Sequence, residues 1–192
     1  MEEGERCFRL LVRLILWACG GTGEIMKVGL ERFDGPFNLL VMPQSLARVV
    51  IHTVFSTQGR EPVFQNAAFR DELHAYLGGC AKTLDCLPLQ IGGVEDHVHL
   101  LTTLSRTITI ADFVKEVKRV STGWIQTRGG LFRQFHWQAG YGCFSVSESK
   151  VPAVIQYIQG QEEHHRQQTF QEELRRILSA HGQAWDERYV WD

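Results

Sequence analysis

The sequence lacks a surplus of charge of either sign, since its 192 residues hold 20 lysines and arginines against 22 aspartates and glutamates. Proteins that attract a phosphate backbone over their whole surface ordinarily carry an excess of basic residues. The composition therefore excludes general electrostatic binding of nucleic acid, and any such affinity has to come from a local basic patch. With 44% hydrophobic residues, the chain has enough apolar material for a buried core.

The sequence also lacks paired cysteines and long apolar runs. Its five cysteines are an odd number and none is spaced as Cys-x-x-Cys, which indicates reduced thiols and a cytoplasmic protein. The most apolar segment, residues 7–21, is interrupted by Arg9 and Arg13 and follows three glutamates. We therefore expect neither a secretory signal nor a membrane segment there.

Periodic structure is missing from the first part of the chain. Residues 18–36 hold five glycines and show no sustained hydrophobic period, which is typical of a linker. We expect residues 1–41 to be a poorly structured extension or linker and residues 42–192 to form the folded domain.

From residue 43 on, strand-like and helix-like patterns alternate. The expected strands cover residues 46–55, 87–94, 97–104 and part of 132–147, and the expected helices cover 66–84, 109–129 and 150–182. Glu95 and Asp96 fit a hairpin turn, and Gly160 is expected to weaken or break the last helix. This order predicts an α+β fold, a ferredoxin-like or RRM-like antiparallel sheet with helices on its faces and an added C-terminal helix that carries Tyr157.

Two histidines, His97 and His99, lie one residue apart in an expected strand. Because successive side chains of a strand point to opposite faces, both imidazoles project from the same face. Histidine is the commonest metal ligand, but this spacing is also compatible with two ordinary surface or core histidines. The pair alone indicates two-thirds of a metal site and calls for a third ligand.

The last expected helix carries a tyrosine on a polar face. Tyr157, Gln161, His164 and His165 are spaced i, i+4, i+7 and i+8. The alternative interpretation places Tyr157 in the buried stripe and leaves the polar residues solvated. A tyrosine hydroxyl, with an ordinary pKa of about 10, is a weak nucleophile, but it can form a covalent intermediate when a metal polarises its target. Attack on a phosphodiester would leave a phosphotyrosine.

One segment is strongly basic, although the chain as a whole has nearly equal numbers of acidic and basic residues. Residues 115–133 hold five basic residues and a single acid, with aromatic residues among and after them. Aromatic faces stack on unpaired bases, so the segment is a candidate DNA-binding surface. Basic residues on the outer face of an amphipathic helix are, however, often only solvated. The five candidates are Lys115, Lys118, Arg119, Arg128 and Arg133.

Four motifs in order resemble a known family. They are SLARVVIHTVFSTQGR in the first expected strand, EDHVHLL around the histidine pair, GYGCFSVSES before the last helix, and VIQYIQGQEEHH around the tyrosine, with WDERYVWD at the end. On these residues the chain is similar to the single-tyrosine HUH transposases of the insertion sequence 200/605 type, which include the REP-associated tyrosine transposases. The resemblance extends over residues 42–192.

The resemblance implies a DNA transposase that cleaves and rejoins single-stranded DNA. Tyr157 would be the nucleophile and would give a 5′-phosphotyrosine and a free 3′-OH. The implied partners are single-stranded DNA hairpins and a second copy of the chain in a homodimer.

The resemblance also implies a metal centre. His97 and His99 would be ligands of Mg²⁺ or Mn²⁺, and Gln161 would be the third ligand. Glu162 or His164 could take the place of Gln161, and the sequence leaves this choice open.

Two other functions are compatible with the same residues. A non-catalytic hairpin-binding protein would keep the fold and the basic segment, bind DNA with a steep salt dependence and be indifferent to Mg²⁺. A metal-dependent phosphodiesterase would use water as its nucleophile and leave no nucleic acid bound to the protein. The effect of Tyr157→Phe on a covalent adduct distinguishes these functions from a transposase.

Overall fold

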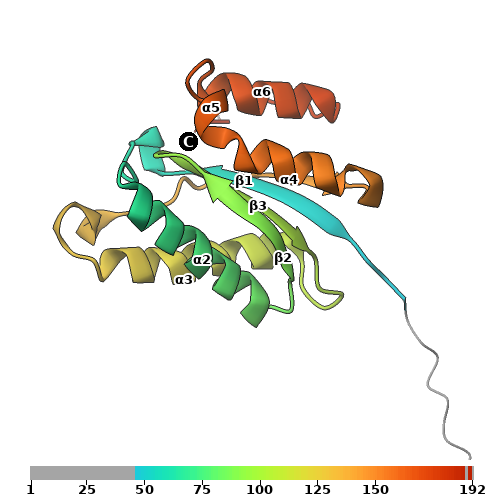
Figure 1. The fold of residues 1–192 in the computed structure, drawn as a ribbon, viewed down its shortest axis with the longest axis horizontal. Helices are drawn as coiled ribbons and strands as arrows, with labels where there is room; N and C mark the ends of the chain where they lie inside the picture. Colours follow the sequence, from blue (N-terminus) through green and yellow to red (C-terminus); the bar gives the residue numbers. More distant parts are fainter. Residues whose placement is uncertain (1–45, 189, 192) are drawn as a thin grey trace, which may run out of the picture. The chain divides into compact units, whose positions relative to one another are not determined.

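The computed structural model describes residues 46–188, 190 and 191, in which helices cover both faces of a four-stranded sheet (Figure 1). The expected extension over residues 1–41 lies outside the described residues. The strands are β1 (Val50–Ser56), β2 (Pro88–Gly93), β3 (His97–Thr103) and β4 (Gly142–Val146). The helices are α2 (Ala67–Thr83), α3 (Ile110–Gln126), α4 (Val151–Gln159), α5 (Gln161–His164) and α6 (Phe170–Ala180), with short 3₁₀ helices at Gln58–Arg60, Gly130–Gln134 and Glu148–Lys150.

The sheet has the strand order β2-β3-β1-β4, and all neighbours are antiparallel. Glu95 and Asp96 lie in the turn between β2 and β3, as their position in the sequence predicted. The predicted α+β fold, an antiparallel sheet with helices on its faces and an added C-terminal helix, is therefore confirmed.

The ends of the first two helices follow from their capping residues. The side chain of Asn66 accepts a hydrogen bond from the backbone N–H of Phe69 at 3.1 Å, and Thr109 accepts one from Asp112 at 3.0 Å. Each cap satisfies a backbone donor that the first turn of a helix leaves unpaired. Helices α2 and α3 therefore begin where the sequence indicates.

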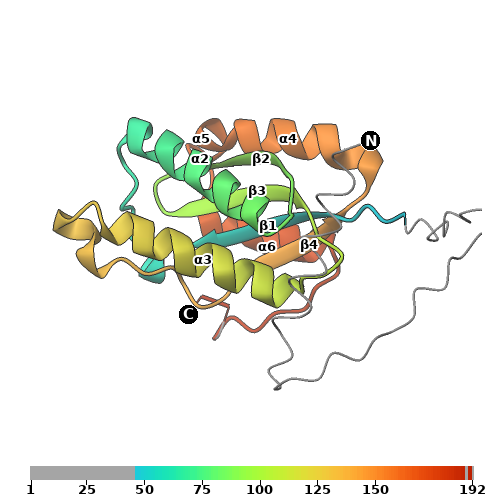
Figure 2. The same cartoon turned by 90° about the horizontal axis from the view of Figure 1, so that it is seen from below.

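Alternate residues of the sheet serve two separate hydrophobic cores. Ile51 and Phe55 of β1 and Leu100 of β3 pack with α2 and α3, while Val50 and Val54 face α4 and α6. Figures 1 and 2 show these helix pairs on opposite faces of the sheet. Since full burial of such a side chain stabilises the fold by about 1.5–3 kcal/mol, both helical layers are held firmly to the sheet.

The helical stretch expected over residues 150–182 is interrupted at Gly160, as expected there, and is divided into α4, α5 and α6. Helix α4 ends at Gln159, next to Gly160, and after α5 the chain begins α6 with a capping box formed by Thr169 and Glu172. The break lets α6 fold back over the same face of the sheet that α4 covers (Figure 1). Two helices instead of one therefore contribute side chains to that face.

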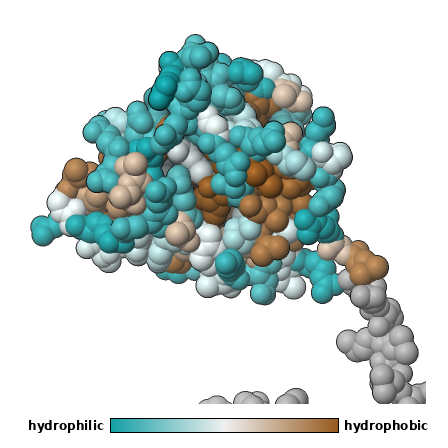
Figure 3. Space-filling model, viewed as in Figure 1, coloured by the Kyte–Doolittle hydropathy of each residue, from teal (hydrophilic) through white to brown (hydrophobic). Residues whose placement is uncertain are grey.

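Helix α4 approaches β2 closely at a glycine. A Cβ atom at Gly92 would lie 2.7 Å from Cγ2 and 2.9 Å from the carbonyl oxygen of Ile158, so only glycine allows this contact. Leu89, Val154 and Ile155, all partly buried, pack around Ile158. Figure 3 shows hydrophobic side chains gathered on the surface over α4 and the β2 side of the sheet.

Within the part of the chain that the structure describes, no helix is long and apolar enough to cross a membrane. The thiols of Cys80, Cys86 and Cys143 are free in that part.

Candidate active site and metal centre

His97 and His99 lie side by side on the face of the sheet that α4 and α6 cover. Both side chains are fully buried, and their ring centroids are 5.0 Å apart. The spacing of two residues along β3 puts both rings on this face. Together with Glu173 they form a buried group whose ligand atoms all lie within 4.8 Å of one another.

A carboxylate fixes the orientation of His97. Its Nδ1 atom lies 2.6 Å from Oδ1 of Asp96, the preceding residue in the turn. Metal-bound histidines commonly donate their second ring N–H to such a partner, which leaves the other nitrogen for the metal. Burial by itself lowers the pKa of His97, but hydrogen bonds to Asp96 and Glu173 outweigh it and raise that pKa to about 9. Metal binding at Nε2 would therefore displace a proton from His97 at neutral pH.

Another histidine fixes the orientation of His99. Nδ1 of His99 lies 2.9 Å from Nε2 of His52, which projects from β1 on the same face. Burial lowers the pKa of His52 to about 3 and also lowers the pKa of His99, so both rings are neutral. With the shared proton on Nδ1 of His99, its Nε2 keeps a lone pair. That Nε2 atom is buried and has no hydrogen-bond partner in the described residues.

Glu173 of α6 stands at the centre of the cluster, with only 1% of its side chain exposed. Its Oε2 atom lies 3.3 Å from Nε2 of His97, 3.5 Å from Nε2 of His99 and 3.0 Å from Nε2 of His165. Its Oε1 atom accepts a hydrogen bond from the side-chain amide of Gln161 at 2.8 Å. Burial alone would raise the pKa of Glu173, but hydrogen bonds from His165 and His97 hold it far below its usual range.

Tyr157 of α4 joins the cluster through its hydroxyl group, which donates a hydrogen bond to Oε1 of Glu173. Its half-buried ring makes edge contacts with His99 and His52, at centroid distances of 5.9 and 6.3 Å. Burial and the neighbouring Glu173 carboxylate raise the pKa of Tyr157 well above its usual value. The hydroxyl is therefore protonated at neutral pH and already has a proton acceptor in contact with it.

The structure thus brings together four predicted site residues, which are His97, His99, Tyr157 and Gln161. Oε1 of Gln161 lies 3.2 Å from Nε2 of His97. The alternatives to Gln161 lie elsewhere, because Glu162 is exposed and paired with Arg70, and His164 is exposed beside the ring of Tyr157.

Sequence reasoning missed Glu173 and His52. Glu173 had a recognisable signal, since it lies on the apolar stripe of α6 next to Leu174 and one turn after Phe170. His52 similarly interrupts the apolar residues Val50 and Val54 on one face of β1. A charged or polar residue on a buried stripe calls for a partner.

The donor set of the cluster fits a divalent metal ion. It offers the imidazole Nε2 atoms of His97 and His99 and the side-chain oxygens of Gln161 and Glu173. The unpartnered, buried Nε2 of His99 supports this fit, because a buried nitrogen without a partner is costly unless something binds it. Carboxylate and amide oxygens suit Mg²⁺ and Mn²⁺, and imidazole is the more usual ligand of transition metals.

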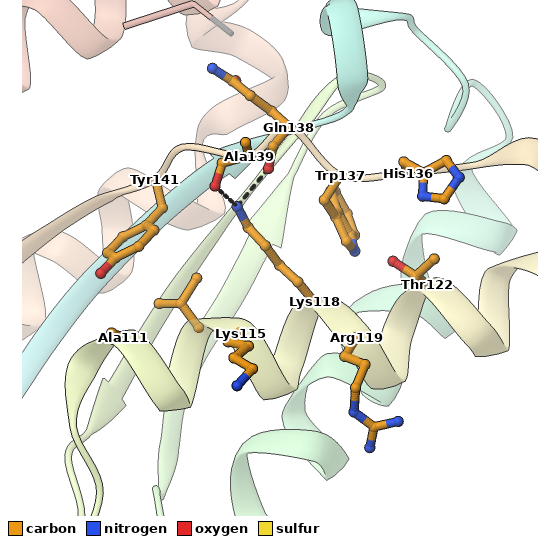
Figure 4. A pocket seen from close by; sticks show the side chains of 11 residues that line it. Ala111, Lys115, Lys118, Arg119, Thr122, His136, Trp137, Gln138, Ala139 and Tyr141 are labelled. Atoms are coloured by element: carbon orange, nitrogen blue, oxygen red, sulfur yellow. Dashed lines mark hydrogen bonds between the residues drawn. The ribbon is translucent and has the colours of Figure 1, made fainter. Parts of the chain in front are cut away.

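Three of the five predicted DNA-binding residues lie together on α3. Lys115, Lys118 and Arg119 line a pocket between α3 and residues 136–141 (Figure 4). This pocket lies on the opposite side of the sheet from the cluster around Glu173, since Lys118 contacts Phe55 of the α2–α3 core.

The other two predicted DNA-binding residues are not part of this pocket. Arg128 is paired with Glu72 at 2.9 Å and lies 4.3 Å over the ring of Trp124. Arg133 is exposed on the 3₁₀ helix Gly130–Gln134. The aromatic residues Phe135 and Trp137 are buried in the core, so their faces are not open to bases.

Comparison with known proteins adds three findings. A family model described as "Transposase IS200 like" matches residues 45–161. The structure of a presumed transposase from Deinococcus radiodurans R1 is similar, with a TM-score of 0.50 and 24% identity over 61% of this chain and 93% of that one. A REP-associated tyrosine transposase bound to a REP hairpin has a TM-score of 0.48 and 12% identity over 65% and 73% of the two chains. None of the curated proteins compared with the chain matches it.

Proposed function

We propose that this chain, which belongs to the IS200-like transposase family, cleaves and rejoins single-stranded DNA through a covalent bond to Tyr157. One observation carries the proposal: the Tyr157 hydroxyl and the histidine pair of β3 meet at the same buried carboxylate. A tyrosine whose proton acceptor and metal-type ligands converge in this way has the parts that nucleophilic catalysis requires.

The proposed step is a substitution at phosphorus. The phenolic oxygen of Tyr157 attacks the phosphodiester, a bond forms between that oxygen and phosphorus, and the bond from phosphorus to the 3′-oxygen breaks. The products are a 5′-phosphotyrosine and a 3′-oxygen that takes a proton from solvent. The phenolic proton leaves for solvent by way of its hydrogen bond to Oε1 of Glu173. Because the new bond is again a phosphodiester, attack by a 3′-OH reverses the step and rejoins a strand without ATP.

The metal site would be held by His97 and His99, with Gln161 and Glu173 supplying oxygen ligands. Mg²⁺ or Mn²⁺ bound there would polarise the phosphodiester and stabilise the charge on the departing oxygen. The two oxygens of Glu173 would have different roles, since Oε2 faces the histidines that would bind the metal and Oε1 faces the Tyr157 hydroxyl. Asp96 and His52 keep the imidazole Nε2 atoms directed at the ion.

The proposed partners are single-stranded DNA hairpins and a second copy of the chain, in the cytoplasm. The apolar surface over α4 and β2 in Figure 3 is a suitable contact area for that second copy. Tyr157 lies next to His99 of the same chain, with 5.9 Å between their ring centroids, which supports a site built within one subunit. Light scattering after size-exclusion chromatography measures the oligomeric state.

The first prediction concerns the nucleophile. End-labelled hairpin oligonucleotides with single-stranded flanks are incubated with the protein and Mn²⁺, and a denaturing gel shows label attached to protein. We expect Tyr157→Phe to abolish the labelled band, by a factor of about 100 or more, because only the hydroxyl that forms the bond is lost. Hairpin binding by this variant is expected to remain near the wild-type level.

Tyr76→Phe is the matched control, because it removes a hydroxyl from α2, outside the catalytic cluster. A labelled band that persists in Tyr157→Phe would assign the nucleophile to another residue. Tight hairpin binding without any band would favour the non-catalytic binding protein, and cleaved DNA without a band would favour a phosphodiesterase.

A further inference from the structure

A second polar pocket lies on the other face of the sheet, away from the catalytic cluster. It has a volume of about 460 Å³ and is bounded by α3 and residues 136–141 (Figure 4). This size falls in the range of about 300–1,000 Å³ that small-ligand sites occupy. None of its lining residues belongs to the catalytic cluster, so its chemistry needs an explanation of its own.

The wall of the pocket is basic and has no carboxylate. Its four basic side chains are Lys115, Lys118, Arg119 and His136. The nearest acid on α3 is Glu116, which does not line the pocket and pairs with Arg119 at 2.6 Å. Both partners of that ion pair are exposed, and exposed pairs contribute little, so a bound anion can take over Arg119 at small cost. The pocket is therefore suited to a negatively charged ligand.

The ammonium group of Lys118 bonds to the backbone of the pocket wall and is therefore not available to a ligand. Its Nζ atom donates to the carbonyl oxygens of Gln138 and Ala139, at 2.8 and 3.3 Å (Figure 4), and to that of Gly140 at 2.7 Å. These three contacts use all three ammonium donors. Lys118 thereby fixes the backbone of residues 138–140, while its positive charge stays inside the pocket wall. Lys115 and Arg119 remain as the cations at the rim.

An aromatic ring lies beside Lys118 in the same pocket. Tyr141 lines the pocket with 43% of its surface exposed, and Nζ of Lys118 lies 5.7 Å from its ring centroid. An exposed ring offers a face on which a planar base can stack. Cations for a phosphate and a ring for a base, which line the same pocket, match the two parts of a nucleotide.

We infer that this pocket binds one unpaired nucleotide, with its base against Tyr141 and its phosphate at Lys115 and Arg119. The inference rests on the proposed function, since it takes the nucleotide to belong to the single-stranded flank of the DNA hairpin. The segment that forms the pocket also reaches the other face of the sheet, because the side chain of Gln138 bonds to Ser56 and to the carbonyl of Val190. A seated nucleotide would hold the flank in a fixed register relative to Tyr157.

The test uses photo-cross-linking to the full chain, with EDTA present to prevent cleavage. A single 4-thiothymidine is placed in turn at each position of the flank, and the cross-linked peptide is identified by mass spectrometry. We expect one flank position to cross-link to residues 136–141. Free deoxythymidine monophosphate is added in a second arm, and its removal of the cross-link at low concentration would assign the same nucleotide site to a free nucleotide.

Binding measurements with variants complete the test. Tyr141→Ala is expected to lower the affinity for the flanked hairpin about tenfold, and Tyr141→Phe is expected to restore it, since stacking needs the ring and not the hydroxyl. Replacing both Lys115 and Arg119 by alanine is expected to reduce the slope of affinity against salt for the flanked hairpin by about 1–2. Lys82→Ala removes an exposed lysine of α2 and serves as the matched control.

Cross-links spread evenly along the flank, or an equal loss in Lys82→Ala, would overturn the inference. Tyr157 adducts formed without a cross-link to residues 136–141 would overturn the nucleotide pocket alone. A cross-link to these residues without any adduct would overturn the proposed catalysis alone.

Discussion

At the scale of single residues, His52 decides which nitrogen of His99 faces the metal position. With the shared proton on Nδ1 of His99, the neutral His52 ring accepts the hydrogen bond and the Nε2 lone pair of His99 stays free. We expect His52→Phe, which cannot accept this proton, to weaken Mn²⁺ binding about 10–100-fold in titration calorimetry, the usual effect of losing such an outer partner.

His52→Gln tests that explanation, because the glutamine side-chain oxygen can accept the same hydrogen bond and should restore much of the Mn²⁺ affinity. His136→Phe replaces a histidine outside the catalytic cluster and is expected to leave the metal affinity unchanged. Wild-type affinity in His52→Phe would show that His99 keeps its orientation without His52.

The residues of the candidate site were predictable to different degrees. His97 and His99 lie on one strand face, and Tyr157 and Gln161 are four residues apart, so local spacing indicates each pair. Glu173 and His52 come from distant segments, and only the folded chain places them beside the histidines of β3. The positions of Glu173 and His52 on apolar stripes predict that both are buried polar residues. These positions do not predict which partner each residue contacts.

At the scale of the elements, Gly92 sets how closely α4 and its tyrosine lie against β2. The Cβ of alanine would collide with Ile158, the neighbour of Tyr157 in α4. We expect Gly92→Ala to lower the free energy of unfolding by about 1–3 kcal/mol, as overpacked sites do. Because α4 has to move outward, the rate of adduct formation should fall as well.

Gly79→Ala is the matched control for this element. A Cβ at Gly79, in the middle of α2, would meet no atom within 4 Å. We expect it to raise the free energy of unfolding by about 0.5–1 kcal/mol, because alanine is the better helix former. Urea unfolding followed by circular dichroism measures both variants, and equal stability of Gly92→Ala and wild type would contradict a tight α4–β2 contact.

Most elements were predictable because each has a clear period and a capping residue, as Asn66 and Thr109 show. The break after Gln159 was expected at Gly160, but the separate start of α6 was not, because the helical pattern continues through residue 182. Thr169 and Glu172 have the spacing of a capping box, which is the local signal for a new helix start. The direction in which α6 then turns depends on the hydrophobic contacts of Phe170 and Leu174 with the sheet, which are long-range.

At the scale of the whole molecule, buried histidines make the stability depend on pH. Burial lowers the pKa of His52 to about 3 and that of His74 to about 4, below the ordinary value of 6.5. Between those values the unfolded chain binds more protons, so the free energy of unfolding falls as the pH is lowered from 6.5 to 4. Each histidine contributes at most about 1.4 kcal/mol per pH unit.

His97 has the opposite effect in the metal-free protein. Its pKa is raised to about 9, so its contribution to stability is complete below pH 6.5 and is lost as the pH rises through 9. Urea unfolding at pH 4.5, 6.5 and 9 measures how the free energy of unfolding changes on the acidic and on the basic side of pH 6.5. His74→Leu should flatten only the acidic limb, and an unchanged acidic slope in that variant would show that His74 is not the titrating group.

The family match and the catalytic cluster have different boundaries. The matched range ends at residue 161, and it includes the histidine pair, Tyr157 and Gln161. Glu173 comes from α6, beyond that range, and still stands at the centre of the cluster. The fold therefore completes the chemistry of the matched region with a carboxylate from its C-terminal helix.

The alternation of β1 directs neighbouring side chains to two separate layers of the molecule. His52 and Ser56 point to the catalytic face, while Phe55 lies beneath the α3 pocket. The side chain of Gln138, which bonds to Ser56, joins the pocket segment to the other face. Substitutions of Lys115, Arg119 or Tyr141 leave that bond in place, so they should alter the inferred nucleotide contact without altering the proposed chemistry at Tyr157.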